Sequence, residues 1–181
     1  GAFSGTALAK VSIPSGITAI GNSVFSGCSR LTNVLIHKGI SKIGDDAFYG
    51  TALTGIIIPK SVTSIGHSAF AGTRLARVPL PLPLSRISNG AFSGTPLRSV
   101  EIPNSVTNLG SAAFYGCTSL TNVVIGTNVA SIGDSTFQYC AGLTSLVIPG
   151  SVTTFAQAAF AYCSNLTTVT IPDGVCDIGY N

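Results

Sequence analysis

Phenylalanine recurs at a nearly constant interval along the whole chain, and this repeat limits the possible fold more than any other feature. The interval is 22 or 23 residues, and the recurring residues are Phe3, Phe25, Phe48, Phe70, Phe92, Phe114, Phe137 and Phe160. A Leu follows each Phe by five or six residues, and two aliphatic residues follow that Leu at fixed positions. A unit this short cannot bury its apolar side chains alone, so successive units must stack on one another.

The unit reads L-x-x-V-x-I-P-x-x-V-x-x-I-G-x-x-A-F-x-G-C, as in residues 97–117 with one Ile replaced by Leu. Its V-x-I segment alternates with period two and predicts a short strand, which the Pro then ends. The G-x-x-A-F segment, as in residues 133–137, predicts a tight turn and about one turn of helix. Neighbouring strands lie roughly 4.8 Å apart, so eight units predict an α/β solenoid about 40 Å long, with a parallel sheet on one face and short helical turns on the other.

This pattern resembles the BspA-type leucine-rich repeat over essentially the whole chain, in eight copies. The resemblance implies a curved solenoid, a role in surface adhesion or protein binding, a cell-surface or secreted location, and no catalytic residues to carry over. The departures are local. Ser88 and Ala156 replace the turn Gly, Phe155 replaces an Ile, and residues 78–84 read VPLPLPL.

The position three residues after each Phe, here called the slot, holds either Cys or Thr. Two residues separate the slot from the next Leu where it holds Cys, namely Cys28, Cys117, Cys140 and Cys163. Only one residue intervenes where it holds Thr, namely Thr6, Thr51, Thr73 and Thr95. We interpret the slot as the start of a turn. A thiol packs there as a small apolar group, whereas a Thr hydroxyl bonds a nearby backbone group in a tighter turn.

The cysteines are expected to be free structural thiols. Cys117, Cys140 and Cys163 fall in consecutive units, where parallel side chains stay roughly 4.8 Å apart instead of converging as a disulfide requires. No C-x-x-C pair or Cys/His cluster indicates a metal site. Cys176 lies outside the slot and is expected to be the most reactive thiol.

No catalytic or cofactor-binding motif is present, so the sequence predicts no enzyme, no cofactor and no metal site. His37 and His67 occupy different positions of the unit and do not form a column. The adjacent pair Asp45 and Asp46 lies at a turn, where Asp commonly caps a helical turn; adjacent carboxylates rarely face one cleft for acid–base work.

The residues between the two aliphatic positions of each strand are expected to point outward. This outward column is Ser12, Leu35, Ile57, Pro79, Glu101, Val124, Val147 and Thr170, of which five are apolar. The preceding outward column is Lys10, Asn33, Gly55, Arg77, Ser99, Asn122, Ser145 and Thr168. An apolar stripe beside small polar residues predicts a protein-binding face; the alternative is that Val and Ile simply suit strands. The predicted face comprises Leu35, Ile57, Arg77, Pro79, Glu101, Asn122, Val124 and Val147.

Charge is divided unevenly along the chain. Residues 1–98 hold nine basic and two acidic residues, a net charge of +7, whereas residues 99–181 hold four acidic and no basic residues, a net charge of −4. A basic cluster is predicted at Arg74, Arg77, Arg86 and Arg98, where it would attract an acidic partner. No nucleic-acid-binding motif accompanies these charges, and no run of 18 apolar residues predicts insertion into a membrane.

The proline-rich unit predicts a weak point near mid-rod, because Pro79 has no N–H to donate within a strand. Leu82 is expected to add exposed apolar surface nearby. This surface is either a place where a partner docks or the result of neutral sequence drift in a repeat that tolerates substitution. Residues 1–181 are expected to form one solenoid. Gly1 and Asn181 occupy the same position of the unit, and the chain contains no Met. We therefore expect either a segment of a longer protein that has lost any targeting segment, or an uncapped array.

These observations favour a non-enzymatic protein-recognition module, for cell-surface adhesion or protein binding through the outward face. The alternative is a structural or linker subunit in a larger assembly, self-associating head to tail through uncapped ends.

Overall fold

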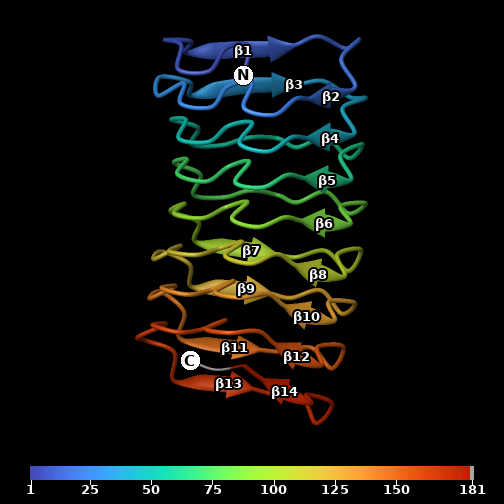
Figure 1. The fold of residues 1–181 in the computed structure, drawn as a ribbon, viewed down its shortest axis with the longest axis vertical. Coiled ribbons are helices and arrows are strands. Elements are labelled where there is room, and N and C mark those ends of the chain that lie inside the picture. The colour runs from blue at the N-terminus through green and yellow to red at the C-terminus, as the bar shows by residue number, and fades with distance from the viewer. Residues whose placement is uncertain (180–181) are drawn as a thin grey trace.

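The computed structural model describes residues 1–179, which form a rod of stacked coils that all run in the same sense (Figure 1). We call the segment from one repeating Phe to the residue before the next Phe a rung, so that rung 1 begins at Phe3 and rung 8 at Phe160. The first and last rungs lie at opposite ends of the rod (Figure 1).

The V-x-I segments form the strands of one face, which we call the front face. These strands are β1 (Lys10–Ile13), β3 (Asn33–Ile36), β7 (Ser99–Glu101), β9 (Asn122–Val124), β11 (Ser145–Val147) and β13 (Thr168–Thr170). They pair in parallel and in register, with Val11 opposite Val34 and Val100 opposite Val123. The predicted alignment of aliphatic columns over a shared interior is therefore confirmed.

Pairing along the front face is interrupted. Its strands form three separate two-stranded sheets, β1–β3, β7–β9 and β11–β13. Residues 55–58 and 77–80, in rungs 3 and 4, have no assigned strand. Pro79 lies in this gap and has no N–H. The weak point predicted near mid-rod stays a prediction, because β9 and β11 are also not paired with each other and contain no Pro.

A second sheet, continuous along the rod, follows the front face in each rung. Its strands have two residues each: β2 (Ala19–Ile20), β4 (Lys42–Ile43), β5 (Ser64–Ile65), β6 (Arg86–Ile87), β8 (Asn108–Leu109), β10 (Ser131–Ile132), β12 (Thr154–Phe155) and β14 (Asp177–Ile178). All eight form one parallel sheet. Since β14 lies seven turns beyond β2, the solenoid has about seven turns. Rung 8 runs into residues 180–181, outside the described part of the chain, so eight whole units are not confirmed.

The segment around each Phe is a series of turns, and the predicted helical turns are wrong: residues 1–179 contain no helix. Ser23 (φ 56°) and Gly27 (φ 70°) hold left-handed backbone angles on either side of Phe25. A right-handed helix needs negative φ at every residue, so two such residues four positions apart exclude a helical turn. The N–H of Phe25 instead donates to the carbonyl of Ala47, one turn of the solenoid further along the chain, at 2.9 Å.

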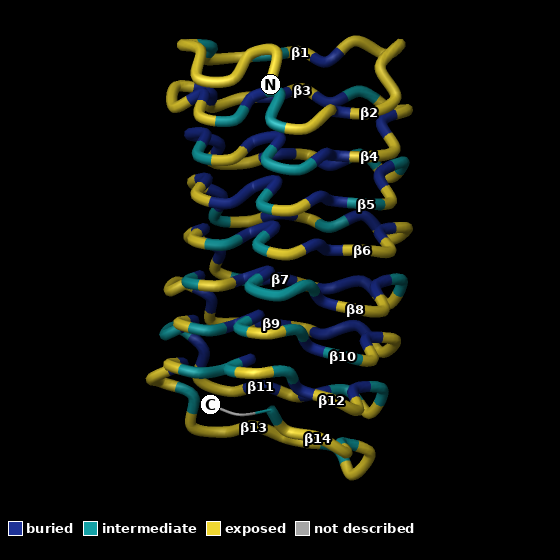
Figure 2. The backbone as a smooth tube through the Cα atoms, viewed as in Figure 1, coloured by how far each residue is buried: buried dark blue, intermediate teal, exposed yellow. Residues whose placement is uncertain are grey.

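The core is a continuous column along the rod axis (Figure 2). Phe rings of successive rungs stack with centroids 5.3–5.7 Å apart and planes within 12° of parallel. The rings of Phe48, Phe70, Phe92, Phe114 and Phe137 are fully buried. Burial of this kind stabilises a rung by roughly 1.5–3 kcal/mol per large side chain. Within residues 1–179 no helix is long and apolar enough to span a membrane.

Candidate functional site

The front face carries the candidate binding surface, because its outward positions are exposed as the sequence predicts. Leu35 is 54% exposed, Ile57 81%, Val124 49% and Val147 68%. The other four predicted face residues, Arg77, Pro79, Glu101 and Asn122, are also exposed. Inward neighbours on the same segments are buried, as at Ile56 and Ile58 on either side of Ile57. The alternation places a stripe of apolar side chains in solvent along the rod.

The stripe has two hollows, and one of them lies where front strands are not hydrogen-bonded to each other. Strands β9 and β11 belong to different two-stranded sheets. A hollow of about 310 Å³ lies there, with Val124 and Val147 in its lining. A second hollow of about 510 Å³ is lined by Leu82, Glu101 and Val124, among others. Leu82 is 75% exposed, so this bulky side chain adds to the apolar surface as expected.

The four arginines of the predicted basic cluster do not share one face. All four are exposed. Arg77 and Arg98 lie on successive rungs of the front side, where the N–H of Arg98 donates to the carbonyl of Ala76 at 3.1 Å. Arg74 precedes them in the turn of rung 4. Arg86 lies instead on β6 of the second sheet, opposite Ser64. Sequence proximity suggested one cluster, but the chain bends between the two sheets within a single rung.

The slot residues satisfy the carbonyl of the repeating Phe in two different ways. The Thr51, Thr73 and Thr95 hydroxyls donate to the Phe carbonyl of their own rung, at 2.8–3.0 Å. Thr6 does the same in rung 1. The predicted bond from Thr to a nearby backbone group is therefore confirmed.

The Cys thiols donate to the Phe carbonyl of the preceding rung. Cys28 Sγ lies 2.9 Å from the Phe3 carbonyl oxygen, and Cys140 Sγ lies 3.2 Å from that of Phe114. The prediction that the thiol packs only as a small apolar group is incomplete, because each slot thiol is also a donor. This cross-rung reach accompanies the extra residue in the Cys-containing turns.

All five cysteines are free; the four slot thiols are buried and Cys176 is exposed. Burial raises the pKa of the Cys117 and Cys163 thiols. It also raises that of Cys140, which the neighbouring thiols raise further. Thiols held protonated in this way are poor nucleophiles. Within residues 1–179 no three His, Cys, Asp or Glu side chains are grouped so as to hold a metal ion.

Asp45 and Asp46 do not cap a helix, and that prediction is wrong because no helix begins there. Asp45 Oδ1 accepts the N–H of His67 in the next rung at 2.8 Å, and the Asp45 N–H donates to Asn22 Oδ1 in the preceding rung at 3.0 Å. Asp46 holds a left-handed backbone angle, φ 53°. Asp45 therefore links three successive rungs.

Three exposed tyrosines form a group that the sequence reasoning did not identify. The rings of Tyr139 and Tyr162 stack with centroids 4.7 Å apart and planes 6° from parallel. Tyr115 meets Tyr139 edge to face at 5.4 Å. Tyr139 (φ 62°) and Tyr162 (φ 60°) hold left-handed angles, two residues after the repeating Phe, where the first six rungs have Gly. A bulky residue there costs about 1–3 kcal/mol, and replacement of the repeating Gly was the available sequence signal.

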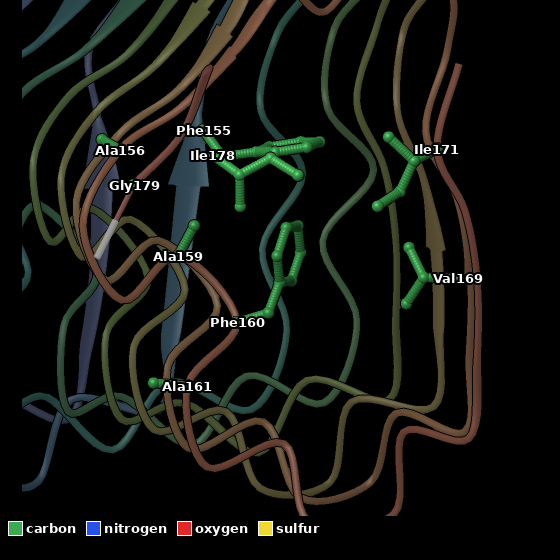
Figure 3. Close-up of a pocket in the computed structure, with 9 residues that line it drawn as sticks. All are labelled: Phe155, Ala156, Ala159, Phe160, Ala161, Val169, Ile171, Ile178 and Gly179. Atoms are coloured by element: carbon green, nitrogen blue, oxygen red, sulfur yellow. The ribbon is translucent and has the colours of Figure 1, made fainter. Parts of the chain in front are cut away.

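The open end of the core at rung 8 forms an apolar hollow of about 310 Å³ (Figure 3). In Figure 3 the side chains of Phe160, Val169 and Ile171 point into the space enclosed by the last coils. Val169 is 38% and Ile171 47% exposed, whereas the equivalent Leu146 and Ile148 of rung 7 are each 3% exposed. A similar hollow of about 380 Å³ at rung 1 includes Phe3 and Ile17 in its lining.

Comparison with solved structures shows which known proteins share this architecture. A leucine-rich cell surface protein from Faecalibacterium prausnitzii is 28% identical, with a TM-score of 0.59 over 96% of this chain and 60% of that one. A leucine-rich repeat protein from Eubacterium ventriosum is also 28% identical, with a TM-score of 0.76 over 96% of this chain and 50% of that one. The chain thus spans only half to three-fifths of their lengths.

The pneumococcal vaccine antigen PcpA shares the fold alone. It is 20% identical, with a TM-score of 0.64 over 96% of this chain and 47% of that protein. A search of curated proteins finds no match.

The repeat itself identifies the family. A family model described as the BspA type leucine-rich repeat region, in six copies, matches residues 1–117 and 85–181, and the two matches together cover the whole chain. The chain therefore belongs to the BspA-type leucine-rich repeat family.

Proposed function

We propose that the chain is a protein-recognition module without enzymatic activity, which binds a partner protein at a cell surface through its front face. The observation that carries the proposal is the exposed apolar stripe of Leu35, Ile57, Val124 and Val147. Repeats of this family are typically non-enzymatic. One matched structure is described as a cell surface protein, which supports the proposed location.

The stripe has the chemical character of a binding surface. Strand propensity alone would be served equally by Thr at the same outward positions, and Thr170 occupies the equivalent position of rung 8. Exposed apolar side chains on neighbouring rungs, such as Leu35 with Ile57 and Val124 with Val147, are typical of protein interaction sites when polar residues surround them. The hollows beside Val124 provide concave surface into which a partner side chain can pack.

Charge around the stripe defines the kind of partner that fits. Lys10 and Arg77 flank the stripe in rungs 1 and 4. No Lys or Arg occurs after residue 98, and Glu101 lies on the stripe in rung 5. A partner with an apolar ridge and acidic groups toward the N-terminal end of the rod would match this distribution.

The test replaces exposed apolar residues of the front face by acidic ones. The double variant Ile57→Glu and Val124→Glu should lose capture of partner proteins from a cell-surface extract without a change in thermal midpoint, because Ile57 is 81% and Val124 49% exposed. A matched control, Asn108→Glu and Thr154→Glu, adds the same charge to exposed positions of β8 and β12 on the second sheet. Equal capture by the front-face variant and the control would exclude the front face as the binding surface.

A second candidate function is structural: coaxial stacking of rods end to end. The exposed core side chains of rung 8 and rung 1 favour it, and a second copy in the same register would cover them. Such contacts join different surfaces and propagate as a filament. Light scattering over a concentration series tests it. A mass that rises with concentration supports stacking, and a constant monomer mass excludes it.

A further inference from the structure

We propose that the tyrosine group of rungs 6 to 8 is a second, separate binding site, and that its ligand is an uncharged saccharide. The site consists of Tyr115, Tyr139 and Tyr162 together with the polar hollow beside Tyr162. It belongs to the turns around the repeating Phe and not to the front strands, so it is distinct from the proposed protein-binding face.

The backbone conformation is the first argument for a binding role. Six rungs have Gly at the left-handed position two residues after Phe. The two remaining rungs, which are consecutive, have Tyr at that position. A Tyr at this position is disfavoured by its Cβ. Strained, bulky residues of this kind cluster at ligand sites.

The side chains give the second argument. Tyr139 and Tyr162 are 41% and 65% exposed, so their stacked rings present aromatic surface to solvent. An exposed aromatic ring with a hydroxyl suits a ligand that has both C–H surfaces and polar groups. A saccharide ring has both.

The hollow beside Tyr162 gives the third argument, because its polar groups match hydroxyl ligands. It has a volume of about 660 Å³, and its lining includes Asp134, Ser135, Gln138 and Gln157. The two amides each offer a donor and an acceptor, and the carboxylate offers acceptors. Asp134 is held in place, since its Oδ1 accepts the Gln157 N–H at 3.0 Å. Sugar hydroxyls are both donors and acceptors and pair with such a set.

Charge limits the ligand class further. Residues 99–181 contain no Lys or Arg, so nothing near the hollow neutralises a phosphate, sulfate or uronate group. Asp134 would repel such groups. An uncharged saccharide has no such penalty.

The experiment restores the repeating residue at both strained positions. Wild type, Tyr139→Gly/Tyr162→Gly and a control, Tyr49→Ser, are screened on an array of neutral oligosaccharides, and the best ligand is titrated by calorimetry. Tyr49 is an exposed tyrosine of rung 3 outside the stack, and Ser26 occupies the same position in rung 2. Wild type and the control should bind alike, and the double variant at least tenfold more weakly. No saturable binding by wild type to any neutral saccharide would overturn the proposal, as would equal binding by the double variant.

Stability and salt dependence separate the site from its alternatives. The double Gly variant should have an equal or higher thermal midpoint, because it removes two strained residues. If its midpoint falls instead, the variant Gln138→Ala/Gln157→Ala is tested, because it leaves the tyrosine stack intact. Saccharide binding by this variant equal to that of wild type would overturn the proposal. Affinity for the neutral saccharide should vary less than twofold between 50 and 500 mM salt, and a steep loss with salt would overturn the proposal of uncharged recognition.

Discussion

The slot residues of rungs 3 to 5 and of rungs 6 to 8 donate to a Phe carbonyl in different ways, and the Phe92 carbonyl at the boundary accepts both kinds of donor. In rungs 3 to 5 a Thr hydroxyl donates to the Phe carbonyl of its own rung. In rungs 6 to 8 a Cys thiol donates to the Phe carbonyl of the preceding rung. In both groups the slot side chain donates to a Phe carbonyl, but the thiol donates to the rung before its own. The turn that follows the slot is one residue longer where the slot holds Cys.

We call rungs 3 to 5 the Thr block and rungs 6 to 8 the Cys block. The core is the same in both blocks, whereas the surface differs between them. Phe92 and Phe114 stack at 5.5 Å across the boundary, within the range of every other pair. All nine basic residues precede residue 99, and the stacked tyrosines follow it. Each rung must match its neighbours inside the rod, but nothing requires its outward side chains to repeat.

The largest expected effect tests whether the two blocks share one core. Phe92→Ala in the Thr block and Phe137→Ala in the Cys block should each lower the free energy of unfolding by about 3–5 kcal/mol, because both rings are fully buried. Urea denaturation measures the loss. A cost confined to one block would mean that the Phe column does not stabilise the rod as a unit.

The second largest expected effect is a loss of folding stability at alkaline pH that comes from the thiols of the Cys block. Burial raises the pKa of Cys117, Cys140 and Cys163 in the folded state, so these thiols stay protonated there after the unfolded chain has released its protons. Stability from them is fully present below about pH 8.5 and declines above it, by up to about 1.4 kcal/mol per thiol per pH unit. Denaturation at pH 7, 9 and 10 measures the slope.

Replacing these three cysteines by Ala should flatten that slope above pH 8.5. Cys176→Ala serves as the control, because Cys176 is exposed, and should leave the slope intact. A triple variant with the wild-type slope would show that other groups cause the alkaline loss.

The smallest effect concerns the Thr block. Thr73→Val keeps the buried shape and removes the donor, and should cost about 1 kcal/mol. The loss is limited because the Thr73 N–H still donates to the same Phe70 carbonyl, at 3.3 Å. Thr54→Val, at an exposed position of the same block, should leave the thermal midpoint unchanged. If both variants behave alike, the slot hydroxyl contributes nothing to stability.

The repeat period was sufficient to predict the parallel front strands, their register and the outward position of Leu35 and Ile57. It was not sufficient for the second sheet, since strands of two residues such as Ser64–Ile65 are too short to show alternation. The helical turns were predicted wrongly because residues such as Ser68 and Ala112 hold left-handed angles that their types rarely adopt. Contacts with neighbouring rungs impose those angles, as when the Ala112 N–H donates to the backbone carbonyl of Asp134 at 2.7 Å.

The amino-acid sequence by itself determined the stacking of rungs, the buried columns and the exposed stripe, because an apolar residue repeated every 22 or 23 positions has only its copies to pack against. The tertiary structure alone decided where surface residues from different parts of a rung meet. It separated Arg86 from Arg77, and it stacked Tyr139 on Tyr162. Those relations depend on how sharply the chain bends within each rung, and that bend follows from hydrogen bonds between rungs that no single repeat contains.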